Sequence, residues 1–337
     1  MTDRDSNFDL LKILLILMVI VLHYFNGNMG GLLLNVTKGS FNYYLSHLLE
    51  SFCIIAVNVF IIITGYFSCE KKSINISKVI KLYSIAIFYG IMIFLILLLF
   101  KKTIINFNLV KQFFNATFSR WFVLTYCILY LLIPFINKLI LSINKKELKT
   151  LIGINIIVFY MWSTFFTNTT IVDSGYGITN FIILYMMGAY IKLYINDDSK
   201  TYYIYLYIIC TLITTIYSFI YGRAWSYSTI FNLISSISLF MIFKNIKIKN
   251  NKIINSLATY TFTVYIIHEN NFVVKFIYNN IFKSNLFWNS NYMIIHLIIT
   301  TIGIYLMCVI IEYLRRKIFS KYFDNKIDNI KYKITCS

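Results

Sequence analysis

The chain has 337 residues, of which 59% are hydrophobic and only 13% are charged. Soluble domains average about 45–50% apolar and about 25% charged residues, so this composition excludes an ordinary soluble enzyme. The formal net charge is +18, but basic residues between long apolar runs are typical of a membrane topology signal rather than of a nucleic-acid-binding surface. We therefore expect the lipid bilayer, and no nucleic acid, as a partner.

About ten apolar stretches are long enough to cross the roughly 30 Å hydrocarbon core of a bilayer as helices. They lie near residues 8–27, 46–68, 78–100, 121–141, 149–166, 177–195, 202–221, 226–244, 257–275 and 291–314. Basic residues gather before the first stretch, after the even-numbered stretches and in the tail, so the positive-inside rule places both termini in the cytoplasm. The sequence predicts an all-α, polytopic integral membrane protein of the cell membrane with about ten transmembrane helices.

We expect one domain, because no linker or shift in composition separates a second one. Residues 1–337 form a single membrane domain in this interpretation, with a helical bundle over about 7–314 and a basic cytoplasmic tail over 315–337. The first stretch lacks a small-residue cleavage site and is expected to stay as a helix. Six cysteines are scattered without metal-ligand spacing, so no metal site is expected.

Four polar residues lie along one face of the first stretch. Eleven residues, almost three helical turns or about 16 Å, separate Lys12 from His23, and Asp9 and Asn26 lie three residues beyond each end. A histidine on such a stripe can act as a general base, because its ordinary pKa is close to physiological pH. The alternative is an interfacial Asp9–Lys12 ion pair and a histidine that bonds a neighbouring helix.

A second polar group lies in the stretch 257–275, where Tyr265 precedes His268, Glu269 and Asn270. Counted outward from the cytoplasm, these residues reach a depth comparable to that of His23, so the two helices could bring them together. In the functional interpretation, Glu269 or Asn270 orients an imidazole or binds substrate hydroxyls; the alternative is an interhelical hydrogen-bond network. Glutamate is seldom left at this depth without a role, which favours function.

Further candidates come from polar or aromatic residues at the ends of stretches or inside them. Asn58 and Tyr66, on either side of Thr64-Gly65, suggest a close helix contact with a polar lining. The pair Arg120-Trp121 and the outer-loop residue Arg223 are typical interfacial anchors, but together they could also line a sugar site.

At these residues the chain resembles the acyltransferase 3 family of multi-span membrane O-acyltransferases. Asp9 to Lys12, followed after ten residues by His23, is similar to that family's signature of Arg, ten residues and His, with lysine in place of arginine. Similar blocks follow in family order at Asn58 to Phe67, Arg120 to Lys138, Leu184 to Ile191 and Thr261 to His268. The resemblance therefore covers about residues 7 to 270, and it is greatest to the subgroup that acetylates bacterial extracellular or capsular polysaccharides.

The resemblance implies transfer of an acetyl group from cytoplasmic acetyl-CoA to a hydroxyl of a polysaccharide or a lipid-linked sugar. The charge pattern offers a cationic mouth for the CoA phosphates, made of Lys12, Lys71, Lys72, Lys78 and Lys81. His23 would deprotonate the sugar hydroxyl or carry the acyl group itself, and the sequence leaves both routes open. Two other classes stay open: a transporter or flippase of a lipid-linked sugar, and a non-catalytic membrane subunit of a polysaccharide assembly complex.

Overall fold

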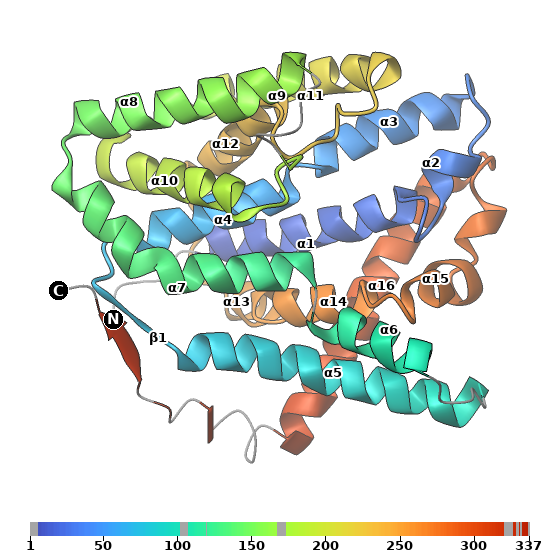
Figure 1. Cartoon of the computed structure of the whole chain (residues 1–337). Helices are drawn as coiled ribbons and strands as arrows, with labels where there is room; N and C mark the ends of the chain where they lie inside the picture. Colours follow the sequence, from blue (N-terminus) through green and yellow to red (C-terminus); the bar gives the residue numbers. More distant parts are fainter. Residues whose placement is uncertain are drawn as a thin grey trace.

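The computed structural model describes residues 6–101, 107–118, 120–166, 173–319, 326–327, 330 and 332–335. These residues form a helical bundle (Figure 1) with one small sheet. The elements up to the middle of the chain are α1 (Asn7–Phe25), α2 (Leu32–Asn35), α3 (Phe41–Cys53), α4 (Ala56–Ser68), β1 (Ser73–Asn75), α5 (Ser77–Lys101), α6 (Phe107–Phe118), α7 (Trp121–Ser142), α8 (Lys145–Asn155), η1 (Ile156–Met161) and α9 (Trp162–Phe165). The second half contains α10 (Ile178–Tyr194), α11 (Lys200–Ile220), α12 (Ile230–Lys244), α13 (Lys252–Ala258), α14 (Thr261–His268), α15 (Val274–Phe276), η2 (Ile277–Ile281), η3 (Ser284–Leu286), α16 (Met293–Phe319) and β2 (Lys333–Thr335).

Seven helices of the described chain are long and apolar enough to cross a membrane. They are α1, the joined α3–α4, α5, α7, the joined α8–α9, α11 and α16, and two shorter apolar helices are α10 and α12. These nine coincide with nine of the ten expected stretches. The multi-pass, all-helical prediction is therefore confirmed, whereas the count of ten crossings and the cytoplasmic termini stay predictions.

The expected stretch 257–275 is not one continuous helix. It is divided into α13, α14 and α15, because the chain turns after Ala258 and again at Glu269. The second turn is held by Asn270, whose side-chain oxygen accepts the amide of Phe272 and whose backbone carbonyl accepts the amide of Val273. Such local bonds compete with a helix and end it.

Helix α1 lies in the middle of the bundle (Figure 1). It contacts α3, α4, α12, α13, α14 and α16. Leu11, Leu15 and Ile20 in α1 are fully buried, since an apolar helix surrounded by others can be hydrophobic all round. The first helix of the chain is therefore the central helix, against which most of the bundle packs.

Helices α4 and α10 approach each other at two glycines. A Cβ on Gly65 would collide with the carbonyl oxygen of Tyr185, and a Cβ on Gly188 would collide with the carbonyl oxygen of Ile62. Small residues allow helix backbones to come this close in a membrane. The close helix contact predicted around Gly65 is therefore observed.

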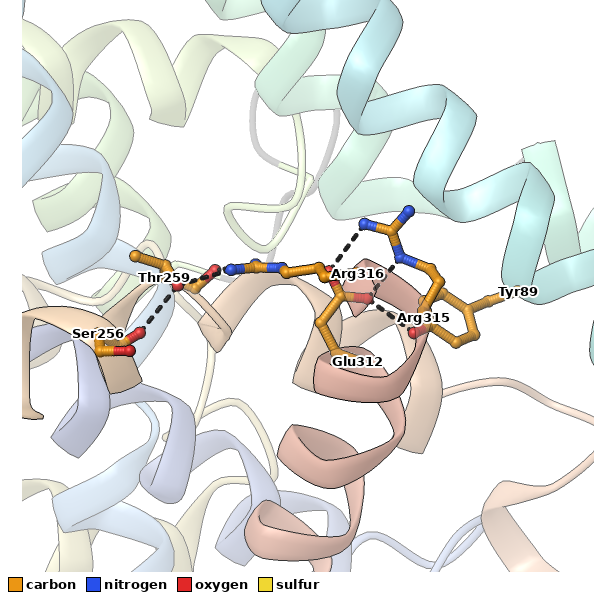
Figure 2. Close-up of polar contacts among 6 residues, drawn as sticks. All are labelled: Tyr89, Ser256, Thr259, Glu312, Arg315 and Arg316. Carbon is orange, nitrogen blue, oxygen red and sulfur yellow. Dashed lines mark hydrogen bonds and ion pairs between the residues drawn. The ribbon is translucent and has the colours of Figure 1, made fainter. Parts of the chain in front are cut away.

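A buried ionic cluster fixes the C-terminal end of α16 (Figure 2). The fully buried carboxylate of Glu312 accepts hydrogen bonds from Arg315 Nε at 2.7 Å, Arg316 Nε at 2.7 Å and the Tyr89 hydroxyl at 2.7 Å. Arg316 also donates to the hydroxyl and to the carbonyl oxygen of Thr259, each at 2.8 Å. The cluster joins α16 to α5 and to the turn between α13 and α14. Because a helix end leaves backbone carbonyls without a partner, the bond from Arg316 to the Thr259 carbonyl also stabilises the end of α13.

The basic tail returns to the bundle near its end. Strand β2 pairs antiparallel with β1, with Ile334 opposite Ile74, and Figure 1 shows both strands near the end of the bundle where α1 begins. Helix α16 continues to Phe319, a little beyond the expected boundary at 314. Part of the expected tail is therefore structured and lies against the membrane domain.

Candidate active site

One face of α1 lines a cavity of about 360 Å³. Lys12, Ile16, Val19, His23 and Asn26 line it and follow one another at steps of four and three residues, and Leu22 and Met29 complete the contribution of this part of the chain. This spacing is that of a single helix face, so the predicted stripe is observed for Lys12, His23 and Asn26. Lys12 and His23 lie about 16 Å apart along the helix, and the cavity extends between them.

The remaining walls come from five parts of the chain. They are Glu50, Ile54, Val57, Phe60, Ile63 and Thr64 on or between α3 and α4; Lys78 and Leu82 on α5; Trp121, Phe122 and Tyr126 on α7; Tyr176 and Tyr227 in the loops before α10 and α12; and Thr261, Phe262, Tyr265 and Glu269 on or next to α14. The lining is mainly apolar and aromatic, with a few polar groups, which is the usual composition of a small-molecule site.

His23 and His268 meet beside the cavity. His23 Nδ1 lies 2.9 Å from His268 Nε2, and the rings are 4.9 Å apart between centroids. On its other side, His268 Nδ1 lies 2.6 Å from the carbonyl oxygen of Val264. His268 is fully buried, whereas His23 is partly accessible. The two helices therefore bring the predicted histidines into one hydrogen-bonded chain that ends at the cavity.

Lys12 occupies the other end of the α1 face. Its ammonium pairs with the Asp9 carboxylate at 3.0 Å, and Asp9 is almost completely buried while Lys12 remains about one third exposed. Because the carboxylate lies one turn before the lysine, it holds the ammonium at the cavity. Lys78 of α5 lines the same cavity.

The three other lysines of the predicted cationic mouth, Lys71, Lys72 and Lys81, lie outside the cavity lining. Lys71 donates to the Ser68 hydroxyl at 3.2 Å, and partial burial together with the Lys78 ammonium lowers the pKa of Lys71. Lys72 is exposed. Their contact with a donor molecule stays a prediction.

Glu269 lines the cavity with an arginine behind it. Its Oε2 atom lies 3.8 Å from Arg120 Nη1, and Arg120 also donates from Nη1 to the Ile266 carbonyl and from Nε to the Ala116 carbonyl. Trp121 lines the cavity, whereas Arg120 is buried and does not. Arg120 thus ties α6 and α7 to the end of α14, and the residue that touches His23 is His268 rather than Glu269.

Three other predicted substrate-binding residues also lie outside the cavity lining. The Asn58 side chain is fully buried and donates to the Tyr227 carbonyl at 2.9 Å. The Tyr66 ring packs against those of Phe8 and Phe240. Arg223 is exposed and reaches the Phe166 carbonyl at 3.5 Å. Asn58 therefore supports a cavity residue from behind, and the substrate contacts of all three residues stay predictions.

Glu50, Tyr176 and Tyr227 line the cavity but are not among the residues predicted from the sequence. A signal for Glu50 was available, because it is an acidic residue inside the second expected stretch, where charged groups are functional candidates by default. The tyrosines carried no such signal, since this chain has 28 of them and only folding shows which face the cavity.

The fold is that of a polytopic membrane protein, a bundle of apolar helices around a mainly apolar cavity. The cavity has ammonium groups near one end and a histidine pair further along, an arrangement suited to group transfer. A family model described as "Acyltransferase domain" (Acyl_transf_3) matches residues 5–313. The chain therefore belongs to the acyltransferase 3 family, and this membership indicates a membrane acyltransferase. No curated protein and no solved structure matches the chain.

Proposed function

We propose that the protein is a plasma-membrane O-acetyltransferase that moves an acetyl group from cytoplasmic acetyl-CoA to a hydroxyl of a cell-surface polysaccharide or exopolysaccharide sugar. The observation that carries the proposal is the His23–His268 pair, which directs one imidazole nitrogen toward a cavity that has ammonium groups further along the same helix face.

The hydrogen bonds fix where the protons of the pair lie. A carbonyl oxygen only accepts, so His268 Nδ1 carries a proton and donates it to Val264. With both rings neutral, His268 Nε2 is then an acceptor, and His23 Nδ1 donates to it. The lone pair of His23 is therefore on Nε2, the atom that a general base or a nucleophile needs.

The Lys12 end fits the donor. Lys12 and Lys78 offer two ammonium groups for phosphates, and apolar side chains such as Ile16, Val19 and Leu82 line the way from there to His23. Acetyl-CoA supplies an activated thioester. A lysine binds phosphate with less directional preference than the arginine of the family's signature. The ion pair with Asp9 fixes the position of the Lys12 ammonium and so makes up part of this difference.

In the direct route, the sugar hydroxyl oxygen attacks the thioester carbonyl carbon. The new C–O bond forms, the C–S bond breaks, and the hydroxyl proton passes to His23 Nε2 and from there to the departing thiolate. In the second route, His23 Nε2 attacks the thioester carbon first, the C–S bond breaks and the CoA thiolate leaves. The sugar hydroxyl oxygen then attacks the acetyl carbon, the C–N bond to His23 breaks, and the hydroxyl proton passes to the thiolate. The same nitrogen serves both routes. Asn26, one turn further along the cavity face, is our candidate for the hydrogen bond to the oxyanion.

Reconstituted vesicles test the proposal and separate it from a transporter. Labelled acetyl-CoA is supplied on one face and acceptor polysaccharide on the other, and the label in the polymer is measured for the purified chain and for empty vesicles. We expect label in the polymer with the protein only. Movement of a lipid-linked sugar across the membrane without consumption of acetyl-CoA would indicate a flippase instead. Neither acetyl transfer nor sugar movement in the vesicles, together with unchanged polymer output in cells that carry His23→Ala, would indicate a non-catalytic subunit.

A further inference from the structure

We propose that Glu50, together with the aromatic wall formed by Trp121, Tyr176 and Tyr227, is the subsite that binds the acceptor, and that the acceptor is a neutral pyranose whose hydroxyls hydrogen-bond to the Glu50 carboxyl group. The inference rests on the proposed function in one respect only, since it takes the bound saccharide to be the acyl acceptor.

The first support is the state of the Glu50 carboxyl group. Glu50 is 8% exposed and lines the same cavity as His23. Within the described part of the chain, its side chain forms no hydrogen bond or ion pair, and its Oε2 atom is buried without a partner. A buried carboxyl group without a partner costs free energy inside a membrane helix. Such a group is expected to persist where a ligand completes its hydrogen bonds.

The second support is the wall beside it. The Trp121 ring lies 4.7 Å from that of Tyr176 and 5.7 Å from that of Tyr227, and the two tyrosine rings are 5.0 Å apart. All three line the cavity. Aromatic faces stack on the C–H faces of sugar rings, while a carboxyl group accepts their hydroxyls. The combination matches a pyranose better than a lipid chain, which offers no donor to Glu50.

The third support is the rigidity of the subsite. Ser51, next to Glu50 on α3, accepts a hydrogen bond from Trp225 Nε1 at 3.0 Å, and the Phe52 carbonyl accepts one from the Tyr207 hydroxyl at 2.9 Å. The Tyr227 backbone is held by the Asn58 side chain at 2.9 Å. Groups fixed in this way lose little entropy when a ligand binds.

Equilibrium binding of saccharides, without acetyl-CoA, tests the proposal on the full-length protein in nanodiscs. The probes are neutral oligosaccharides released from the producing cells' surface polysaccharide, and the matched pair N,N′-diacetylchitobiose and chitobiose, which differ by ammonium groups. Binding is measured by the change in tryptophan fluorescence, and Trp121→Phe identifies the signal from the cavity. The variants are Glu50→Gln, Glu50→Leu and, as a matched control, Glu70→Gln, which changes an exposed glutamate outside the cavity.

We expect the native chain and Glu70→Gln to bind neutral saccharides equally. Glu50→Gln, which keeps one oxygen acceptor and replaces the other carboxyl oxygen by an amide nitrogen, should bind about tenfold more weakly, and Glu50→Leu more weakly still. The thermal midpoint of Glu50→Gln should not fall, because no partner inside the protein is lost; this separates a ligand-binding role from a structural one.

Equal binding by the native chain and Glu50→Gln would overturn the proposal, and so would the absence of saccharide binding by the native chain. Preference for chitobiose over its diacetylated form would also overturn it, because Glu50 would then bind an ammonium rather than hydroxyls. Saccharide binding that depends on Glu50 without any acetyl transfer would support the subsite while contradicting the proposed function, so the two failures are distinguishable.

Discussion

His23 on α1 and His268 on α14 are 245 residues apart in the chain, yet their Nδ1 and Nε2 atoms lie 2.9 Å apart. Removal of the second ring should therefore affect chemistry more than binding of the donor. We expect His268→Ala to lower kcat by roughly tenfold to a hundredfold, because His23 loses the partner that fixes its proton and its orientation. The KM for acetyl-CoA should stay the same. Steady-state kinetics of purified protein measure both, and a native kcat would contradict this role of His268.

Lys12 should matter to the donor and not to the acceptor. Lys12→Gln removes an ammonium group from the cavity, and we expect the KM for acetyl-CoA to rise about tenfold, the size of one charge-assisted hydrogen bond. Lys12→Arg should bind at least as well as the native chain, since guanidinium holds phosphate with two bonds. Lys146→Gln, an exposed lysine outside the cavity, is the control. The idea fails if Lys12→Gln changes only the KM of the acceptor.

Two glycine-to-alanine substitutions should change the stability of the fold in opposite directions, because Gly65 lies in the tight α4–α10 contact and Gly153 lies in open space on α8. Gly65→Ala places a methyl group against the Tyr185 carbonyl, and we expect it to destabilise the fold by about 1–3 kcal/mol. Gly153→Ala lies in α8 with nothing within 4 Å of the new Cβ, so it should stabilise by about 0.5–1 kcal/mol. The unfolding midpoints of both variants and of the native chain are measured in the same detergent. Midpoints that do not change in either variant would contradict both expectations.

Glu312 is expected to be the most sensitive position outside the cavity. Glu312→Ala takes away the carboxylate that both Arg315 and Arg316 bind, and loss of one partner of a buried ionic cluster costs about 3–5 kcal/mol. Glu147→Gln, which retains the side-chain oxygen of an exposed helix cap, should change stability by less than about 0.5 kcal/mol. Thermal unfolding and the yield of folded protein in membranes measure both variants, and equal yields would contradict a structural role for the cluster.

Much of the cavity face of α1 could be predicted because it depends on one helix alone. The steps from Lys12 to His23 and Asn26 follow from the period of the helix, and the comparable depth of His268 followed from counting along its own stretch. Both inferences need only that the segments are helical where these residues stand, and the structure satisfies that condition.

Contacts between helices were less accessible to sequence reasoning. Arg120 and Trp121 are adjacent in the sequence, but Arg120 is the extended residue that precedes α7 and Trp121 is the first residue of that helix. Only the fold shows that Trp121 lines the cavity while Arg120 donates to the Ile266 carbonyl. The break between α13 and α14 depends on Arg316, which binds Thr259 from a helix more than fifty residues away. A hydropathy profile alone does not predict such a break in a helix, because the residues on both sides of it are apolar.

The role of His23 in acyl transfer can be measured by comparing three forms of the protein. Transfer of labelled acetyl from acetyl-CoA to polysaccharide is measured in membranes with equal amounts of the native chain, His23→Ala and His47→Gln. The last changes a histidine that is outside the cavity lining and packs against Phe219 and Trp225. We predict that His47→Gln transfers label like the native chain and that His23→Ala loses roughly a hundredfold or more of the rate. Transfer by His23→Ala at the native rate would mean that His23 is neither the general base nor the acyl carrier.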